Sequence, residues 1–357
     1  MPNAAHKTSI PKILAPIKAY TGAVKVIQAG ADEIYCGVRT PGLEDFELYR
    51  GASTDIPTYK EFNQVTKYAH SHNVKVLVTI NQPFIIDSME KLMGSHIRNC
   101  IDAGADSLIV GDLGMLQLVK EITGDTKICA STYLSATNRE AVEFLRRAGF
   151  SRVVLERQVP LEQIIDIVKS SDIEIEVFVH GSGCSNINVN CYFYHYKFPA
   201  MDQGYLKIDG IKFPCALPYE VYDGSAEHVK LGTFPIIDAY TFCSLCELPS
   251  LLRSGVYGLK IEGRGINEEY QASTTKLYRE SIDMLQQGDE DLFWHKLDTL
   301  KKTFVPLPQT LPLNNLQELC CEQKRCYYSP KFHAPYKQKL SWQAWTKLQC
   351  KLLVVQP

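Results

Sequence analysis

The sequence predicts a (β/α)8 barrel of the TIM type, and two patterns support this fold class. Eight short apolar segments recur along residues 12–262, and amphipathic segments at helical spacing lie between them. Strands that read as near-continuous apolar runs are typical of parallel sheets covered on both faces. An open doubly wound sheet is the alternative. No G-x-G-x-x-G motif follows the first strand, however, which argues against a dinucleotide-binding sheet.

Several of the predicted strands follow the same local signal. A glycine ends the preceding helix, because a residue without a Cβ accepts the left-handed conformation, and the strand begins shortly afterwards. These glycines are Gly30, Gly104, Gly149 and Gly255. The strands are predicted near residues 12–16, 33–37, 74–80, 106–110, 127–131, 152–156, 174–180 and 256–262. The clearest helices are predicted at 60–70, 138–147, 161–169 and 267–287, the last with Asn267 as its N-cap.

The composition is that of a globular protein of 357 residues, 45% hydrophobic and 22% charged, which is long enough for a large core. A formal net charge of −2 gives no overall field that would attract nucleic acid or an anionic membrane. We find neither a signal-peptide pattern nor an apolar run that could span a bilayer, so we expect a soluble cytoplasmic protein. In that reducing compartment, 12 cysteines favour a metal or redox role over a disulfide framework.

The connection after the seventh strand is far longer than the others. It begins at Gly181-Ser182-Gly183, where we expect the strand to end in a turn, with Cys184 directly on that turn. Long inserts at the carboxyl ends of barrel strands are where such folds carry their chemistry. The insert is therefore the first place to look for a functional site.

Five cysteines lie in this insert or at its exit: Cys184, Cys191, Cys215, Cys243 and Cys246. Thiolates are the usual ligands of iron–sulfur clusters, and four of them complete a [4Fe–4S] site. The C-x-x-C spacing of Cys243 and Cys246 also suits zinc or a redox pair. The alternative for each residue is a small buried hydrophobic side chain.

Six motifs taken together resemble peptidase family U-32, the collagenase-like proteins. This family also includes anaerobic ubiquinone-hydroxylation proteins and tRNA and ribosomal RNA hydroxylation proteins. The resemblance covers roughly residues 10–288. The motifs are Leu14-Ala15-Pro16, residues 29–37, residues 176–184, Cys215-Ala216-Leu217-Pro218, residues 243–252 and residues 259–264.

This resemblance implies a [4Fe–4S] cluster, and by motif its ligands are Cys184, Cys191, Cys215 and Cys243. Cys243 is preferred to Cys246 because it stands at the family's distance before Leu248-Pro249. The resemblance also implies oxygen-independent hydroxylation with prephenate as oxygen donor, and a possible homologous partner subunit. The family's Ser-Gly-Arg before the second cysteine is here Asn188-Val189-Asn190, which leaves the substrate open between a quinone, an RNA base and a small metabolite.

Polar residues at the ends of the predicted strands give the catalytic candidates Glu156, Glu262 and Arg264. Strand ends of a barrel converge on one opening, so these side chains can hold one substrate together. Arg264 could bind a carboxylate of prephenate through two hydrogen bonds, and either glutamate could move protons if burial raised its pKa. The alternatives are structural: Glu262 neutralises Arg264, and His180 is a hydrogen-bonded core residue.

We predict two domains, a barrel with the cluster site at residues 1–288 and a C-terminal extension at 289–357. Residues 302–357 carry eight Lys or Arg against two Glu, interleaved with aromatic residues. Such a pattern can follow an RNA strand or can simply be a solvated surface. Four more cysteines lie here, Cys320, Cys321, Cys326 and Cys350, but adjacent cysteines do not easily bind one ion.

The leading interpretation is an iron–sulfur enzyme that performs oxygen-independent hydroxylation or a related modification. A collagenase-like peptidase is the first alternative, although the sequence contains neither G-x-S-x-G nor H-E-x-x-H. A non-catalytic cluster-binding subunit of a heteromeric complex is the second.

Overall fold

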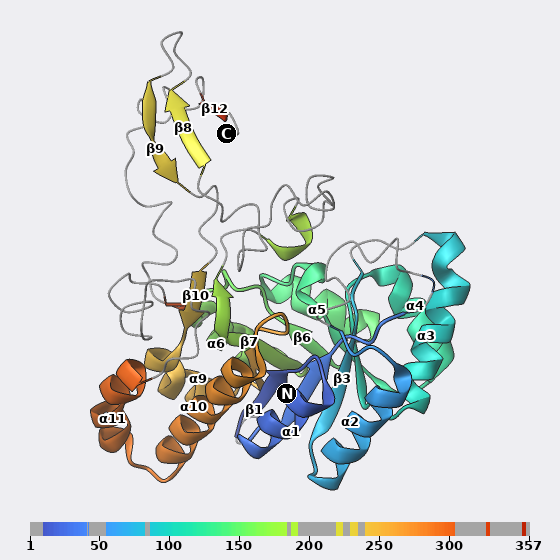
Figure 1. The fold of residues 1–357 in the computed structure, drawn as a ribbon, viewed down its shortest axis with the longest axis horizontal. Coiled ribbons are helices and arrows are strands. Elements are labelled where there is room, and N and C mark those ends of the chain that lie inside the picture. Colours follow the sequence, from blue (N-terminus) through green and yellow to red (C-terminus); the bar gives the residue numbers. More distant parts are fainter. Residues whose placement is uncertain are drawn as a thin grey trace.

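Eight parallel strands close into a barrel in the computed structural model, which confirms the predicted (β/α)8 fold (Figure 1). The model describes residues 10–40, 42, 55–82, 86–183, 187–191, 219–223, 229–234, 240–303, 326–328 and 352–354. The barrel strands are β1 (Lys12–Pro16), β2 (Glu33–Cys36), β3 (Lys75–Ile80), β4 (Ser107–Val110), β5 (Lys127–Ala130), β6 (Arg152–Val154), β7 (Glu174–Gly183) and β11 (Gly258–Ile261). Each pairs with its neighbour in chain order, and β11 closes the barrel between β7 and β1.

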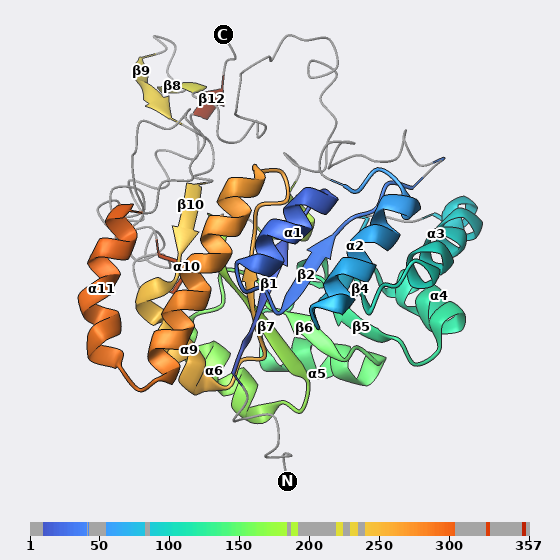
Figure 2. The same ribbon diagram turned by 60° about the horizontal axis from the view of Figure 1, so that its bottom comes forward.

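The helices surround the strands, and α1 and α10 lie side by side over β1 (Figure 2). They are α1 (Tyr20–Gln28), α2 (Tyr59–Ser71), α3 (Glu90–Asp102), α4 (Leu113–Thr123), α5 (Arg139–Ala148), α6 (Leu161–Ser170), α9 (Leu248–Ser254), α10 (Glu268–Gln286) and α11 (Glu290–Thr303). The N-cap predicted at Asn267 is confirmed, since its side chain accepts a hydrogen bond from the Tyr270 amide. The glycines predicted to be left-handed are so at Gly30, Gly104, Gly149 and Gly255, with φ of 96°, 103°, 103° and 80°. None of the described helices is long and apolar enough to cross a membrane.

Four charged side chains pack together inside the barrel. Arg152 begins β6 and donates to both carboxylate oxygens of Glu33, at 2.6 and 3.0 Å, and to Glu176 at 3.0 Å. Lys260 donates to the other oxygen of Glu176 at 2.8 Å. Burial alone would raise the pKa of Glu176, but the Lys260 and Arg152 charges lower it below its usual value. Glu33, Arg152, Glu176 and Lys260 are all buried, and we call them the inner ion cluster.

A β-bulge in β7 decides where His180 lies. Lys260 pairs with Phe178, yet the next residue of β11 pairs with His180, so Val179 is an extra residue in β7. Simple alternation would place His180 inside the barrel, and the bulge turns it outward instead. Its ring packs against Tyr270 and Tyr278 of α10, with centroids 5.9 and 5.7 Å away. Burial lowers the pKa of His180 to about 3, so it is a neutral residue of the core, and its predicted burial is confirmed.

The turn predicted at residues 181–183 is wrong, because these residues continue β7. The strand β10 (Tyr240–Cys243) supplies their antiparallel hydrogen-bond partners, and Gly183 pairs with Tyr240. This pairing comes from the far end of the insert, so the local sequence does not show it. A separate antiparallel sheet contains β8 (Tyr219–Asp223), β9 (Lys230–Phe234) and β12 (Leu352–Val354), none of which the sequence predicted.

Candidate active site at the barrel mouth

The mouth of the barrel carries one hydrogen-bonded cluster built from the ends of two strands and from one short helix. Arg157 follows β6 and donates to Glu262, which follows β11, at 2.8 Å. The other end of its guanidinium donates to the side chain of Asn188 at 2.5 Å. Asn188 belongs to the short helix η4 (Asn188–Asn190), and its side-chain amide donates to Thr132 at 2.9 Å. We call Glu156, Arg157, Asn188 and Glu262 the mouth cluster.

Glu156 is the member of the mouth cluster with an unusual protonation equilibrium. It is 2% exposed, and one carboxylate oxygen accepts a hydrogen bond from the Asn188 main-chain amide at 3.1 Å. The other oxygen has no hydrogen-bond partner among the described residues. Burial raises the pKa of Glu156 to about 7, against the lowering effect of the Arg157 charge. Near neutral pH this carboxyl group is therefore present in both forms and can give or take a proton.

A glycine in β7 makes room for Glu262. Gly181 has φ of +123°, and a Cβ there would lie 2.5 Å from the Cβ of Glu262. Any other residue would push Glu262 away from Arg157 and would also be strained at this φ. The side chain of Glu262 is 31% exposed, so it lies where the mouth cluster meets solvent.

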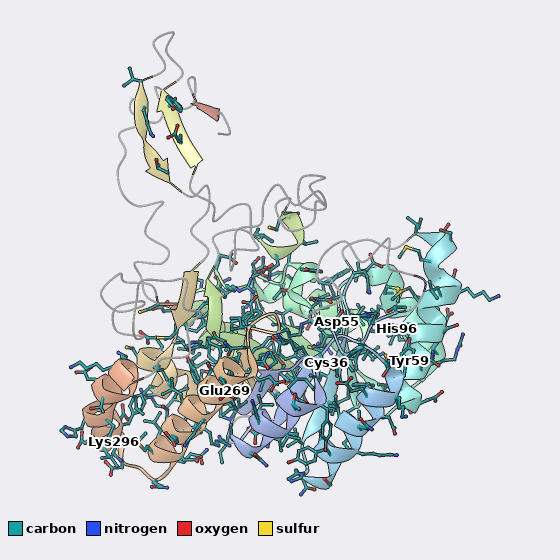
Figure 3. The ribbon with its side chains drawn as sticks, in the orientation of Figure 1. Cys36, Asp55, Tyr59, His96, Glu269 and Lys296 are labelled. Atoms are coloured by element: carbon teal, nitrogen blue, oxygen red, sulfur yellow. The ribbon has the colours of Figure 1, made fainter. Side chains whose placement is uncertain are left out.

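Arg264 stands apart from the mouth cluster. Its Nη1 donates to Thr79 at 2.9 Å and to Asp55 at 3.3 Å, and its guanidinium lies 5.8 Å from the ring centre of Tyr35. Its ion-pair partner is thus Asp55, and the interpretation that Glu262 neutralises Arg264 is wrong. Figure 3 shows Asp55 beside Cys36, whose pKa is raised by burial and by the Asp55 charge. The structure therefore places Glu156 and Glu262 in one cluster and Arg264 in another.

Of the four cysteines predicted to bind an iron–sulfur cluster, two lie on described segments close to the mouth cluster. Cys191 directly follows η4, and Cys243 ends β10; neither forms a disulfide. Cys184 and Cys215 lie outside the described residues, and the part of the chain that is described contains no group of three metal-binding side chains. Thiol donors on segments that border the mouth cluster suit an iron–sulfur cluster in their chemistry. The buried ammonium of Lys301 donates to the sulfur of Cys246 at 3.0 Å.

Another polar pair, between a half-buried tyrosine and a buried histidine, joins α2 and α3 (Figure 3). The Tyr59 hydroxyl and Nδ1 of His96 are 2.8 Å apart. Burial lowers the pKa of His96 to about 4, so its ring is neutral. This pair joins two helices and belongs to the packing of the barrel wall.

Sequence reasoning missed the partners that hold the candidate residues. Arg157 had a local signal, because it adjoins Glu156 at the same strand end. Asn188 appeared only as a departure from the family motif. Asp55 and Thr79 had no signal, since they meet Arg264 from positions 209 and 185 residues away.

The model of peptidase family U32 matches residues 18–306. This chain therefore belongs to peptidase family U32. Among its relatives is an uncharacterized protease of Methanocaldococcus jannaschii, 30% identical over 82% of this chain and 69% of the relative. A tRNA hydroxylation protein P2 of Bacillus subtilis is 26% identical over 82% of this chain and 92% of the relative. A 23S rRNA 5-hydroxycytidine synthase of Escherichia coli is 29% identical over 83% of this chain, but the chain spans only 43% of that relative.

Proposed function

We propose that this chain is an iron–sulfur enzyme that hydroxylates a base of RNA without dioxygen. The observation that carries the proposal is the position of η4. Asn188 holds the carboxyl group of Glu156, and Cys191 follows three residues later on the same short segment. A carboxyl group suited to proton transfer and the segment that carries the Cys191 thiol therefore border one opening of the barrel. The names of two family members, from Bacillus subtilis and Escherichia coli, support RNA as the substrate.

The cluster would be held by Cys184, Cys191, Cys215 and Cys243, as the family motif implies. A bound [4Fe–4S] cluster supplies a one-electron redox centre whose potential depends on burial and hydrogen bonding. Cys243 is 1% exposed and Cys191 is half-buried, so the described part of the site would shield the cluster from water on one side.

Glu156 is suited to move a proton during the reaction. A general acid or base works best when its pKa is near the working pH, and burial brings the Glu156 carboxyl there. Its second oxygen faces no partner among the described residues, so a substrate hydroxyl or amino group would complete its hydrogen bonding. Glu262 holds Arg157 in place and faces solvent.

Arg264 is suited to bind an anionic oxygen donor such as prephenate. Both of its hydrogen bonds among the described residues come from Nη1, which leaves Nε and Nη2 as donors for a carboxylate. Thr79 and Asp55 fix the orientation of the guanidinium, and a fixed guanidinium binds carboxylates with two parallel hydrogen bonds. A second cation, Arg157, lies in the neighbouring cluster.

The proposal is tested by purifying the full chain without air and measuring iron, sulfide and absorption. We expect a broad band near 400 nm, roughly where iron–sulfur charge transfer absorbs. RNA from anaerobically grown cells with and without the gene is then digested and analysed by mass spectrometry for hydroxylated nucleosides. A chain without iron and sulfide, or RNA with the same hydroxylated nucleosides in both strains, contradicts the proposal.

A peptidase is the second candidate, because one relative is named as a protease. It predicts that metal-free protein cleaves gelatin at the same rate as the iron-loaded form. Cleavage that survives both removal of iron and substitution of Glu156 by Gln would favour this candidate over hydroxylation.

A further inference from the structure

Two buried aromatic rings connect the inner ion cluster with the arginines of the barrel mouth. Tyr35 of β2 and Phe178 of β7 are 4% and 5% exposed. The ammonium of Lys260 lies 4.3 Å from the ring centre of Tyr35 and 6.0 Å from that of Phe178. Lys260 also pairs with Phe178 in the register of β11 and β7. Both rings therefore lie beside the same cation of the inner ion cluster.

Each ring also lies beside one arginine. The guanidinium carbon of Arg157 is 4.4 Å from the ring centre of Phe178, and that of Arg264 is 5.8 Å from the ring centre of Tyr35. The negative face of an aromatic ring attracts a cation within about 6 Å, and more strongly where water is excluded. Both arginines are buried, so each has an aromatic contact in addition to its hydrogen bonds.

The two rings are themselves held in place. The Tyr35 hydroxyl donates to the main-chain oxygen of Ile261 in β11 at 3.0 Å. Phe178 stands in the paired part of β7, and its main-chain oxygen accepts a hydrogen bond from the Tyr328 hydroxyl. Packing alone would accept a leucine at either position, because branched aliphatic residues usually fill the interior of such barrels. A leucine, however, has no negative face that could attract a guanidinium.

We propose that Tyr35 and Phe178 are positioning residues, Tyr35 for Arg264 and Phe178 for Arg157. This inference rests on the proposed function, in which Arg264 binds the anionic oxygen donor and Glu156 moves the proton. Tyr35 then acts on donor binding through Arg264, whereas Phe178 acts on proton transfer through Arg157. The two rings therefore have separate consequences, although both lie beside Lys260.

The charges around Glu156 give the effect of Phe178 a sign. Arg157 on the same strand end and Glu262 after β11 are its charged neighbours, and η4 contributes the neutral Asn188. The Arg157 charge lowers the pKa of Glu156 against the effect of burial. Without the ring of Phe178, Arg157 is less restrained and its charge acts less, so Glu156 should keep its proton to higher pH. Water that entered the vacated space would have the opposite effect, because burial is what raises this pKa.

Leucine variants of the two rings test the proposal. Full-length wild type, Phe178→Leu, Tyr35→Leu and Tyr35→Phe are purified without air. The infrared band of the protonated carboxyl group gives the titration midpoint of Glu156, and calorimetry gives the affinity for prephenate. We expect Phe178→Leu to raise the midpoint by roughly half a pH unit and to leave prephenate binding unchanged. We expect Tyr35→Leu to bind prephenate roughly fivefold more weakly with an unchanged midpoint, and Tyr35→Phe, which keeps the ring, to retain the affinity.

Phe62→Leu is the matched control, because Phe62 is a fully buried phenylalanine of α2. It should lower the thermal midpoint, as Phe178→Leu does, and change neither readout. Phe178→Met replaces Phe178→Leu if the leucine variant does not fold. A changed Glu156 midpoint or prephenate affinity in Phe62→Leu would show that loosening the core is enough, and would overturn the inference.

The remaining outcomes separate this inference from the proposed function. An unchanged or lowered Glu156 midpoint in Phe178→Leu overturns the role of Phe178. Equal prephenate affinities in Tyr35→Leu and Tyr35→Phe overturn the role of Tyr35. Both results leave the proposed function intact as long as the wild type binds prephenate and Glu156 titrates near pH 7. A wild type that does neither contradicts the proposed function, and this inference with it.

Discussion

The inner ion cluster and the mouth cluster contain the same residue types in one barrel, yet their chemistry differs. In the inner cluster, Glu176 contacts two cations, Arg152 at 3.0 Å and Lys260 at 2.8 Å, and its pKa is lowered. In the mouth cluster, Glu156 is equally buried but is hydrogen-bonded to a neutral amide, and its pKa is raised to about 7. A buried carboxylate with cation partners keeps a fixed charge, whereas one without them keeps an exchangeable proton.

This difference separates a structural role from a chemical one. Glu33 and Arg152 of the inner ion cluster are the first residues of β2 and β6, and in barrels of this type the end where the strands begin contributes to stability. The mouth cluster lies where the strands end, which is the end that carries catalysis in such barrels. Both clusters contain buried charged residues, so charge and burial do not distinguish them. The hydrogen-bond and ion-pair partners of Glu176 and Glu156 distinguish the structural role from the chemical one.

The largest effect is expected from removing the cation of the inner ion cluster. Arg152→Met leaves Glu33 and Glu176 buried with less compensation, and breaking a buried ion pair from one side costs about 3–5 kcal/mol. Urea unfolding measures the change in the free energy of unfolding. Arg146→Met is the control, because Arg146 pairs with Glu143 on the surface, and we expect little change there. Equal stabilities of the two variants would contradict a structural role for the inner ion cluster.

Glu156→Gln should remove activity and leave the fold and the iron content intact. The amide keeps an oxygen that can accept the hydrogen bond from Asn188 but cannot exchange a proton. Loss of a general acid or base typically lowers the rate about 10²–10⁴-fold. The yield of hydroxylated nucleoside measures this effect. Wild-type yield from Glu156→Gln would show that the proton is carried elsewhere.

The free energy of unfolding should change with pH in opposite directions for Glu156 of the mouth cluster and Glu176 of the inner ion cluster. Glu156 has a raised pKa in the folded state, so the folded chain binds more protons than the unfolded one between about pH 4.5 and 7, and stability falls as pH rises through this window. The effect is at most roughly 3 kcal/mol. Glu176 has a lowered pKa, so its contribution is present above its usual value and is lost as pH falls below it. Thermal midpoints of the wild type and Glu156→Gln across this range are the measurement, and parallel curves would contradict the assignment.

The smallest effect is expected at Arg264. Arg264→Lys keeps the charge but loses the planar guanidinium, so hydrogen bonds to both Thr79 and an incoming carboxylate cannot form in the same geometry. We expect roughly tenfold weaker binding of prephenate, about 1.4 kcal/mol, with unchanged iron content. Calorimetric titration with prephenate measures it. Unchanged affinity would show that the oxygen donor does not bind at Arg264.

The sequence predicted the barrel well because its signals are local. Apolar strands and left-handed glycines such as Gly149 depend on neighbouring residues, and all eight strands lie where they were expected. The bulge at Val179 was not predictable, because alternation continues through His180 and only the pairing with β11 shows the shift. The contacts that hold Arg264 join distant segments, and no local pattern encodes them.

The protonation of Glu156 can be observed directly by infrared difference spectroscopy. The band of a protonated carboxyl group is followed between pH 5 and pH 9 in the wild type and in Glu156→Gln, where the band of this residue is absent. We predict a carboxyl group that titrates with a pKa of about 7 in the wild type and is missing from the variant. Identical spectra of the two proteins, or a Glu156 carboxyl group already ionised at pH 5, would contradict an exchangeable proton at the barrel mouth.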